Sequence, residues 1–106
     1  MANTYKNSKV DLTTAIATTL YSCPASTTAI VKSILVSDDS GSGDTITLTI
    51  TSGSDVFSLY KVKAVGANGT VELLTAPLVV QASEILKVTA ATADRLHVVA
   101  SYLEIT

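Results

Sequence analysis

Apolar and polar residues alternate with a period of two along most of this chain. The stretch DTITLTIT, residues 44–51, is the clearest example, because Ile46, Leu48 and Ile50 fall on one side of an extended backbone. Successive side chains of a strand point to opposite faces of its sheet. The pattern therefore predicts a half-buried strand whose outer face carries Thr45, Thr47 and Thr49.

Turn-forming clusters divide the rest of the chain into short segments of the same kind. The clusters SDDSGSGD, SGSD and GANG are rich in Gly, Ser, Asp and Asn, and Asn-Gly is a strong hairpin signal. Pro77 indicates an edge strand or a bend. The segments between the turns are rich in β-branched residues, which favours strands. We expect strands within residues 13–22, 27–38, 44–51, 56–65, 70–75, 84–91 and 95–106.

These strands define the expected fold class. Short strands that recur about every 8–12 residues, with turns between them, are typical of all-β sandwiches and barrels. We expect an all-β protein with a single antiparallel β-sandwich of about seven or eight strands, of which the jelly roll is one form.

The first nine residues lack this pattern. Residues 1–9 are polar and offer no periodic apolar positions to a core. Such a segment is either a disordered tail or an arm that docks on a neighbouring molecule, and both alternatives stay open. The chain is thus expected to comprise a polar tail or arm at 1–9 and a single β-sandwich domain at 10–106.

The last expected strand, within residues 95–106, is apolar on both sides. A sandwich strand normally has one side in water. This strand is therefore either central and covered by a loop, or in contact with another chain. One side carries Leu96, Val98, Ala100 and Tyr102, and the other carries Val99, Leu103 and Ile105.

The composition favours contact with a partner. The chain has 106 residues, of which 47% are hydrophobic and only 15% charged, and its mean hydropathy is +0.44. About 25% charged residues is usual. A well-filled core beneath a Ser/Thr-rich surface is one explanation, and apolar surface buried against a partner or second copy is the other. The low charge favours the second.

Charge and sequence patterning also exclude several partners. The net charge is −2 and the seven cationic residues are scattered, whereas a nucleic-acid binder needs clustered cations. No apolar run approaches 18 residues, so we expect no membrane span, and the N-terminus lacks the apolar region of a signal peptide. A single cysteine forms no internal disulfide, which agrees with folding in a reducing cytoplasm.

Candidate chemistry is sparse. His97 is the single histidine and lies in a strand-like stretch, RLHVV, without a recognisable nucleophile nearby. Cys23 is expected to be a small buried residue. Asp38, Asp39 and Asp44 surround SGSG, and three carboxylates in a Gly-rich loop could bind a calcium ion. Their spacing matches neither the EF-hand loop nor the Gly-Gly-x-Gly-x-Asp repeat, so a solvated turn is favoured. We expect no enzyme, no cofactor and no metal.

Two long stretches resemble small structural proteins of tailed-bacteriophage virions. TTLYSCPASTTAIVKSILVSDDSGSGDTITLTIT resembles the opening half of that pattern, and LTAPLVVQASEILKVTAATADRLHVVASYLEI resembles its closing half. The chain departs from the pattern at Asp38-Asp39, where Asn is more usual, and at Ser83-Glu84, where Gly-Asp is usual. The resemblance implies a β-sandwich without catalytic residues, present in many copies on a particle.

The resemblance and the composition together predict a phage virion protein, made in the host cytoplasm, that acts by binding. A capsid decoration, or cement, protein is the first hypothesis, and a neck, tail or fibre-associated component is the second. A carbohydrate- or calcium-binding β-sandwich module is the alternative from another class. The expected partners are further copies of the chain, with a trimer as one form, and a major capsid or other virion protein. The predicted contact residues are Thr45, Thr47, Thr49, Val99, Leu103 and Ile105.

Overall fold

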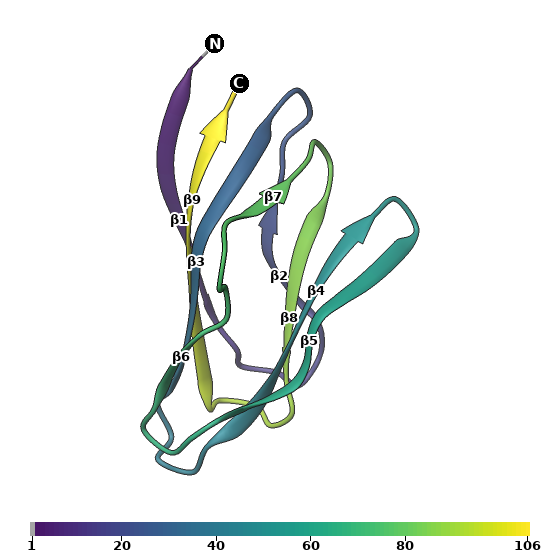
Figure 1. The fold of residues 1–106 in the computed structure, drawn as a ribbon. Coiled ribbons are helices and arrows are strands. Elements are labelled where there is room, and N and C mark those ends of the chain that lie inside the picture. The colour runs from purple at the N-terminus through teal and green to yellow at the C-terminus, as the bar shows by residue number, and fades with distance from the viewer. Residues whose placement is uncertain (1) are drawn as a thin grey trace.

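A computed structural model describes residues 2–106, and this part of the chain forms nine strands in two antiparallel sheets (Figure 1). No helix within this part is long and apolar enough to cross a bilayer. The strands are β1 (Asn3–Asp11), β2 (Thr18–Ser22), β3 (Thr28–Asp38), β4 (Asp44–Ser52), β5 (Asp55–Val65), β6 (Thr70–Glu72), β7 (Leu78–Val80), β8 (Ile85–Ala90) and β9 (Leu96–Ile105).

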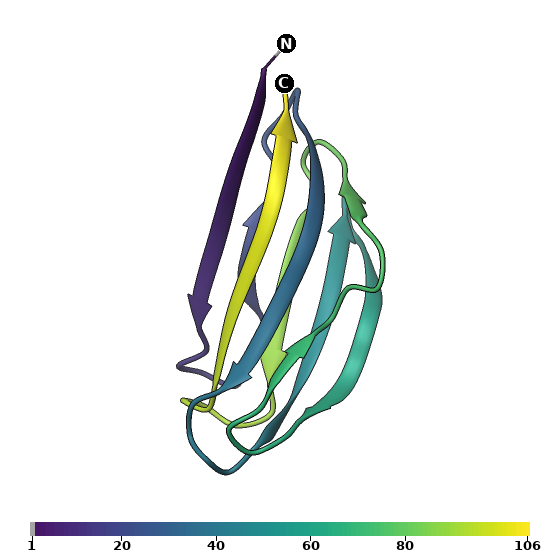
Figure 2. The same cartoon turned by 60° about the vertical axis from the view of Figure 1, so that its left-hand side comes forward.

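The two sheets pack face to face as the two layers of a sandwich (Figures 1 and 2). The first sheet has the order β1-β9-β3, and both β6 and β7 pair with the free edge of β3. The second sheet has the order β2-β8-β4-β5. The predicted all-β, antiparallel β-sandwich is confirmed.

Most connections cross from one sheet to the other. Within residues 2–106, β4 and β5 are the consecutive strands that pair as a hairpin, while β1 pairs with β9 at the opposite end of the chain. The two described ends lie side by side (Figure 1), and Ala2 and Thr106 exchange backbone hydrogen bonds of 3.2 and 3.0 Å. Hydrogen bonding between the two strands therefore continues to both ends of the described residues.

The core consists of the inward-facing half of each alternating strand. In β4, Ile46 and Leu48 are fully buried while the intervening threonines are half-buried, as the sequence pattern predicts. In β9, Leu96, Val98 and Ala100 are fully buried. Burying apolar area yields about 25 cal/mol per Å² removed from water, so these inner faces supply most of the stabilisation.

The strand count exceeds the expected seven or eight for two reasons. Proline cannot donate a ladder hydrogen bond, and Pro77 separates β6 from β7, which are three residues each and pair with different parts of β3. Between them Leu73 is buried, and its N–H donates to the Ile34 carbonyl at 2.9 Å. Pro77 thus marks an interrupted edge, as predicted. The other additional strand is β1.

Strand β1 corrects the expectation of a tail or arm at residues 1–9. Residues 3–11 pair with β9 along their whole length, from Asn3 opposite Ile105 to Asp11 opposite His97. The prediction failed because it relied on apolar periodicity, whereas β1 is mostly exposed and is held by main-chain hydrogen bonds to a neighbour. The sandwich therefore begins near residue 3.

Candidate interaction surfaces

The outward-facing side chains of β1, β9 and β3 form a surface that we call the β9 face. Strand pairing arranges these side chains in five rows that run across the three strands. The second and fourth rows are largely apolar, and the central row is small and polar. From one end to the other the rows are Asp11, His97 and Ser37; Lys9, Val99 and Leu35; Asn7, Ser101 and Ser33; Tyr5, Leu103 and Ile30; and Asn3, Ile105 and Thr28.

Several apolar side chains of this face remain in contact with solvent. Tyr5 is 73% exposed and Leu35 is 42% exposed, while Val99 and Leu103 are half-buried. Val79 of β7 lies opposite Ile30 and is 53% exposed, so it extends the fourth row onto another strand. An apolar patch that spans several strands is typical of a contact surface.

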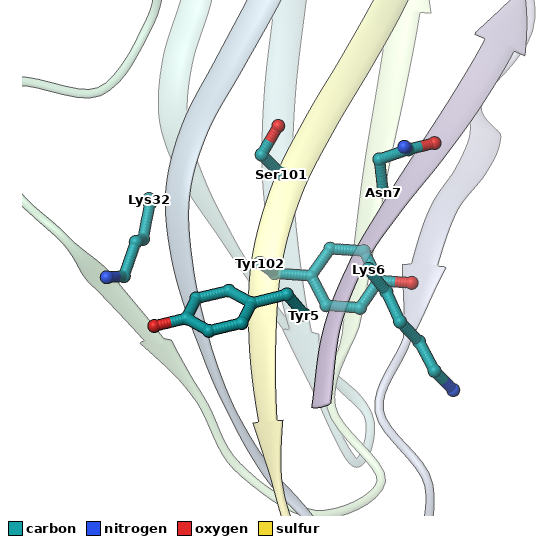
Figure 3. A pocket seen from close by; sticks show the side chains of 6 residues that line it. All are labelled: Tyr5, Lys6, Asn7, Lys32, Ser101 and Tyr102. Carbon is teal, nitrogen blue, oxygen red and sulfur yellow. The ribbon is translucent and has the colours of Figure 1, made fainter. Parts of the chain in front are cut away.

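Tyr5 forms one wall of a shallow hollow on this face. Its ring lies across β9 and points toward Lys32 of β3 (Figure 3), whose Nζ is 5.5 Å from the ring centroid. That distance allows a cation–π interaction. The hollow measures about 300 Å³ and is lined by Tyr5, Lys6, Asn7, Lys32, Ser101 and Tyr102.

A second hollow lies farther along the same two strands. His97 Nε2 lies 3.3 Å from Asp11 Oδ1 at its rim, and both side chains are well exposed. An exposed pair of this kind contributes little to stability. His97 lies in a strand, as its sequence context predicts. The hollow measures about 460 Å³ and is lined by Lys9, Val10, Asp11, His97, Val98 and Val99.

The threonine face lies on the second sheet. Thr45, Thr47 and Thr49 project outward from β4 and are half-buried between β5 and β8. The hydroxyl of Thr47 accepts a 3.1 Å hydrogen bond from the Val62 N–H, at an irregularity in β5. Threonine is therefore used here to hold an edge strand as well as to cover a sheet without charge.

The structure thus separates the predicted contact residues into two sets. Val99 and Leu103 lie together with Ile105 on the β9 face, and the three threonines lie on the other sheet. Their role in binding stays a prediction. The exposed Tyr5 and Leu35 were not among the predicted contact residues, because only strand pairing brings them beside β9. The further exposed large apolar residues, also not predicted, are Ile16, Val56, Phe57, Leu59, Val62 and Val79.

Asp38 organises the loop that suggested a metal site. Its side chain is buried, and its carboxylate accepts backbone N–H groups of Ser40, Gly41 and Gly43 at 3.1–3.2 Å and of Asn68 at 2.9 Å. Hydrogen bonds from the Ser40 hydroxyl and from the N–H groups of Asn68, Gly43 and Ser40 hold the pKa of Asp38 far below its usual range. Among residues 2–106 no three metal-ligating side chains cluster. The turn itself is exposed at residues 39–42, as expected, whereas the Asp38 side chain is buried beneath it.

A polar cluster fastens β1, and hence the β9 face, to the sandwich. The buried Glu104 carboxylate accepts a hydrogen bond from the Tyr21 hydroxyl, at 2.6 Å between the two oxygens. Its other oxygen lies 2.9 Å from Lys6 Nζ. The hydrogen bond from Tyr21, followed by that from Lys6, lowers the pKa of Glu104, and Glu104 in turn raises the pKa of Lys6. Tyr21 and Tyr102 also pack with ring centroids 4.3 Å apart. This cluster links both sheets.

Cys23 is buried, as predicted. It is 2% exposed, and its thiol lies within 3.4 Å of the Thr27 carbonyl oxygen and 3.6 Å of the Val80 carbonyl oxygen. A buried thiol donating to carbonyl groups is a packing residue, and it contributes nothing to either face.

No family model matches this chain, and no curated protein does. Among solved structures, it is similar to two crystal structures of a pentameric capsid protein isolated from metagenomic phage sequences. Each is 22% identical over 92% of this chain, with TM-scores of 0.49 and 0.47. The chain spans 59% and 60% of the lengths of those two chains.

Proposed function

We propose that this chain is a structural protein of a phage virion, and in particular a capsid decoration protein that acts by binding and not by catalysis. The observation that carries the proposal is the β9 face, where apolar rows through Val99 and Leu103 lie open on the outside of a sheet. The sequence resemblance to small structural proteins of phage virions supports a location on a phage particle.

Both outer faces suit attachment to a protein lattice. Desolvating an unpaired charge costs several kcal/mol, and the strands β4 and β9 carry no charged side chain in the middle of their outer faces. A protein that binds the assembled shell, and not its free subunits, stabilises the shell by mass action. A major capsid protein and further copies of this chain are the proposed partners.

We also propose that the sandwich is a jelly roll. Jelly rolls are eight-stranded double sheets built from two Greek keys. The repeated crossing between sheets, the pairing of β1 with β9 and the division of one edge into β6 and β7 support this assignment.

Binding to particles of the phage that encodes this chain tests the function. The purified protein is mixed with heads of this phage and, separately, with its tails, and the amount of bound protein is measured by co-sedimentation. We expect binding to heads and a higher temperature of head disruption. Binding to tails alone would favour the neck, tail or fibre role, and binding to neither would contradict a virion function.

A further inference from the structure

We infer that the β9 face is a self-complementary interface, which a second copy of this chain covers by packing face to face about a twofold axis. The inference deepens the proposed function and rests on it, since it names a partner for the same surface. The axis runs across the strands, between the two copies, and passes over the central row of Asn7, Ser101 and Ser33.

The order of the rows carries this inference. Counted from the central row, one apolar row lies on each side and a more polar row follows at each end. A twofold axis over the centre reverses that order, so each apolar row meets the other one. Leu103 then meets Val99 of the second copy, and Ile30 meets Leu35. Such isologous matching is what a closed dimer requires.

The shape of the face agrees with this arrangement. The same rotation places the exposed Tyr5 over Lys9 of the second copy, which lines the second hollow together with Val99. A tyrosine inserted there buries its ring against Val99 and meets a cation. Tyrosines that fill pockets are common binding anchors, and an ammonium within about 6 Å of the ring is attracted to it.

The charges also agree. Lys32 precedes the central Ser33, on the side of Ile30, whereas Glu72 lies opposite Leu35, on the other side. The rotation therefore brings Lys32 of one copy toward Glu72 of the other. The carboxylate of Glu72 is already oriented, because it accepts the Ser33 hydroxyl and the Ile34 N–H, the latter at 2.8 Å.

A twofold axis along the strands would fit less well. It also superposes the apolar rows, but it places Lys9 over Leu35 of the second copy. The Lys9 ammonium donates to Asn7 Oδ1 at 2.8 Å, and this arrangement would remove it from water without an opposite charge. It also places Tyr5 over Ile30, away from the second hollow. The crosswise axis is the one that places Tyr5 over the second hollow.

The size of the face is sufficient for a specific contact. Nine residues along a strand and three to four strands across give a planar footprint of about 500 Å² per copy. Two copies together then bury about 1,000 Å², which is near the lower limit for specific interfaces. We therefore expect a dimer that forms at about 10–100 μM.

Analytical ultracentrifugation over that concentration range tests the inference. The wild-type chain should dimerise, and Leu35→Lys should weaken dimerisation by about tenfold or more, because it puts a charge against Ile30 of the second copy. Leu35 is exposed and faces Glu72, so the variant should fold, which circular dichroism and thermal melting verify. Ser58→Lys, the same charge at an exposed position of the second sheet, is the matched control and should dimerise normally.

Crosslinking tests the axis. A short bis-maleimide should join two copies of Asn7→Cys, because the crosswise axis places Asn7 over Asn7 of the second copy, and it should not join two copies of Ser58→Cys on the second sheet. A monomer at 100 μM, equal dimerisation of Leu35→Lys, or failure of the Asn7→Cys crosslink would overturn the inference. A trimer or pentamer that binds heads would overturn the twofold contact and leave the proposed function intact.

Discussion

At the scale of single residues, Asp38, Gly43 and Val62 shape the backbone of loops and edge strands without contributing to the hydrophobic core. The Asp38 carboxylate accepts hydrogen bonds from four backbone N–H groups in two loops. One of these groups belongs to Asn68, which is 30 residues away in the chain. Gly43 approaches the same place with φ +72, and a Cβ added there would lie 3.0 Å from the Val65 carbonyl oxygen. Val62 also has positive φ, 54°, although it is β-branched and exposed.

Replacing Asp38 should loosen both loops. Asp38→Ala leaves buried N–H groups without an acceptor, and we expect the melting temperature to fall by roughly 5 °C or more. Asp39→Ala, at the exposed neighbouring position, is the control and should change little. Differential scanning calorimetry measures both variants. Equal melting temperatures for the two variants would contradict an organising role for Asp38.

Relieving the backbone at Val62 should stabilise the protein. Asparagine tolerates positive φ better than a β-branched residue. We expect Val62→Asn to raise the free energy of unfolding by about 1 kcal/mol, as measured by urea denaturation. Val56→Asn is the control, since Val56 is equally exposed on β5 but is absent from the positive-φ positions, and it should bring no gain.

At the scale of elements, β1 resembles β5 and differs from the long central strands β3, β4 and β9. Its side chains are largely exposed, and it depends on main-chain pairing with β9 and on the contacts of Lys6 and Ser8. Lys6 reaches Glu104, and Ser8 Oγ lies 3.0 Å from the Tyr102 hydroxyl. A lysine that points toward the inner side of an edge strand also discourages pairing with foreign strands.

The Glu104 cluster should make the attachment of β1 depend on pH. The pKa of Glu104 in the folded protein is lowered from 4.5. The contribution of Glu104 to the free energy of unfolding is therefore complete above about pH 4.5, and it is lost as the pH falls through the pKa of the folded state. We expect Glu104→Gln to be about 1–2 kcal/mol less stable than wild type at pH 7, with the difference shrinking toward pH 3. Urea denaturation at several pH values measures it. A difference that stays constant between pH 7 and 3 would contradict this account.

At the scale of the whole molecule, strands from the two ends of the chain complete one sheet. β1 and β9 are neighbours, and Ala2 and Thr106 are joined by a reciprocal pair of hydrogen bonds. The fold therefore depends on pairings between distant segments, including β3 with β9 and β2 with β8. Such topologies fold more slowly than those built from local contacts.

The adjacency of the ends predicts a tolerated circular permutation. A short Gly/Ser linker from Thr106 to Ala2, with new ends at Gly53 in the β4–β5 turn, should yield a folded protein that melts within about 5 °C of wild type. New ends at Gly41 should lower the melting temperature much more, because they separate the groups that Asp38 gathers. Thermal melting followed by circular dichroism compares the two permutants.

Much of the fold could be predicted because its signals are local. Alternation in residues 44–51 reports the burial of Ile46 and Leu48, and the turn clusters mark where strands end. The candidate surface was predicted only in part. Val99 and Leu103 stood out because β9 is apolar on both sides, yet nothing local shows that Tyr5 and Leu35 lie beside them. That neighbourhood is a property of strand order, which brings residues about 65 and 95 positions apart into one row.

By itself, the sequence determined seven of the nine strands, the inner face of an alternating strand such as β4, and the scarcity of charge, because each depends on residues within a few positions of one another. Tertiary structure alone decided that polar β1 is a strand, that Asp38 is a buried anchor, and that the outer side of β9 stays open to solvent. The physical reason is that a backbone N–H or a carboxylate is satisfied by whichever partner lies nearest in space, and that partner can come from the far end of the chain.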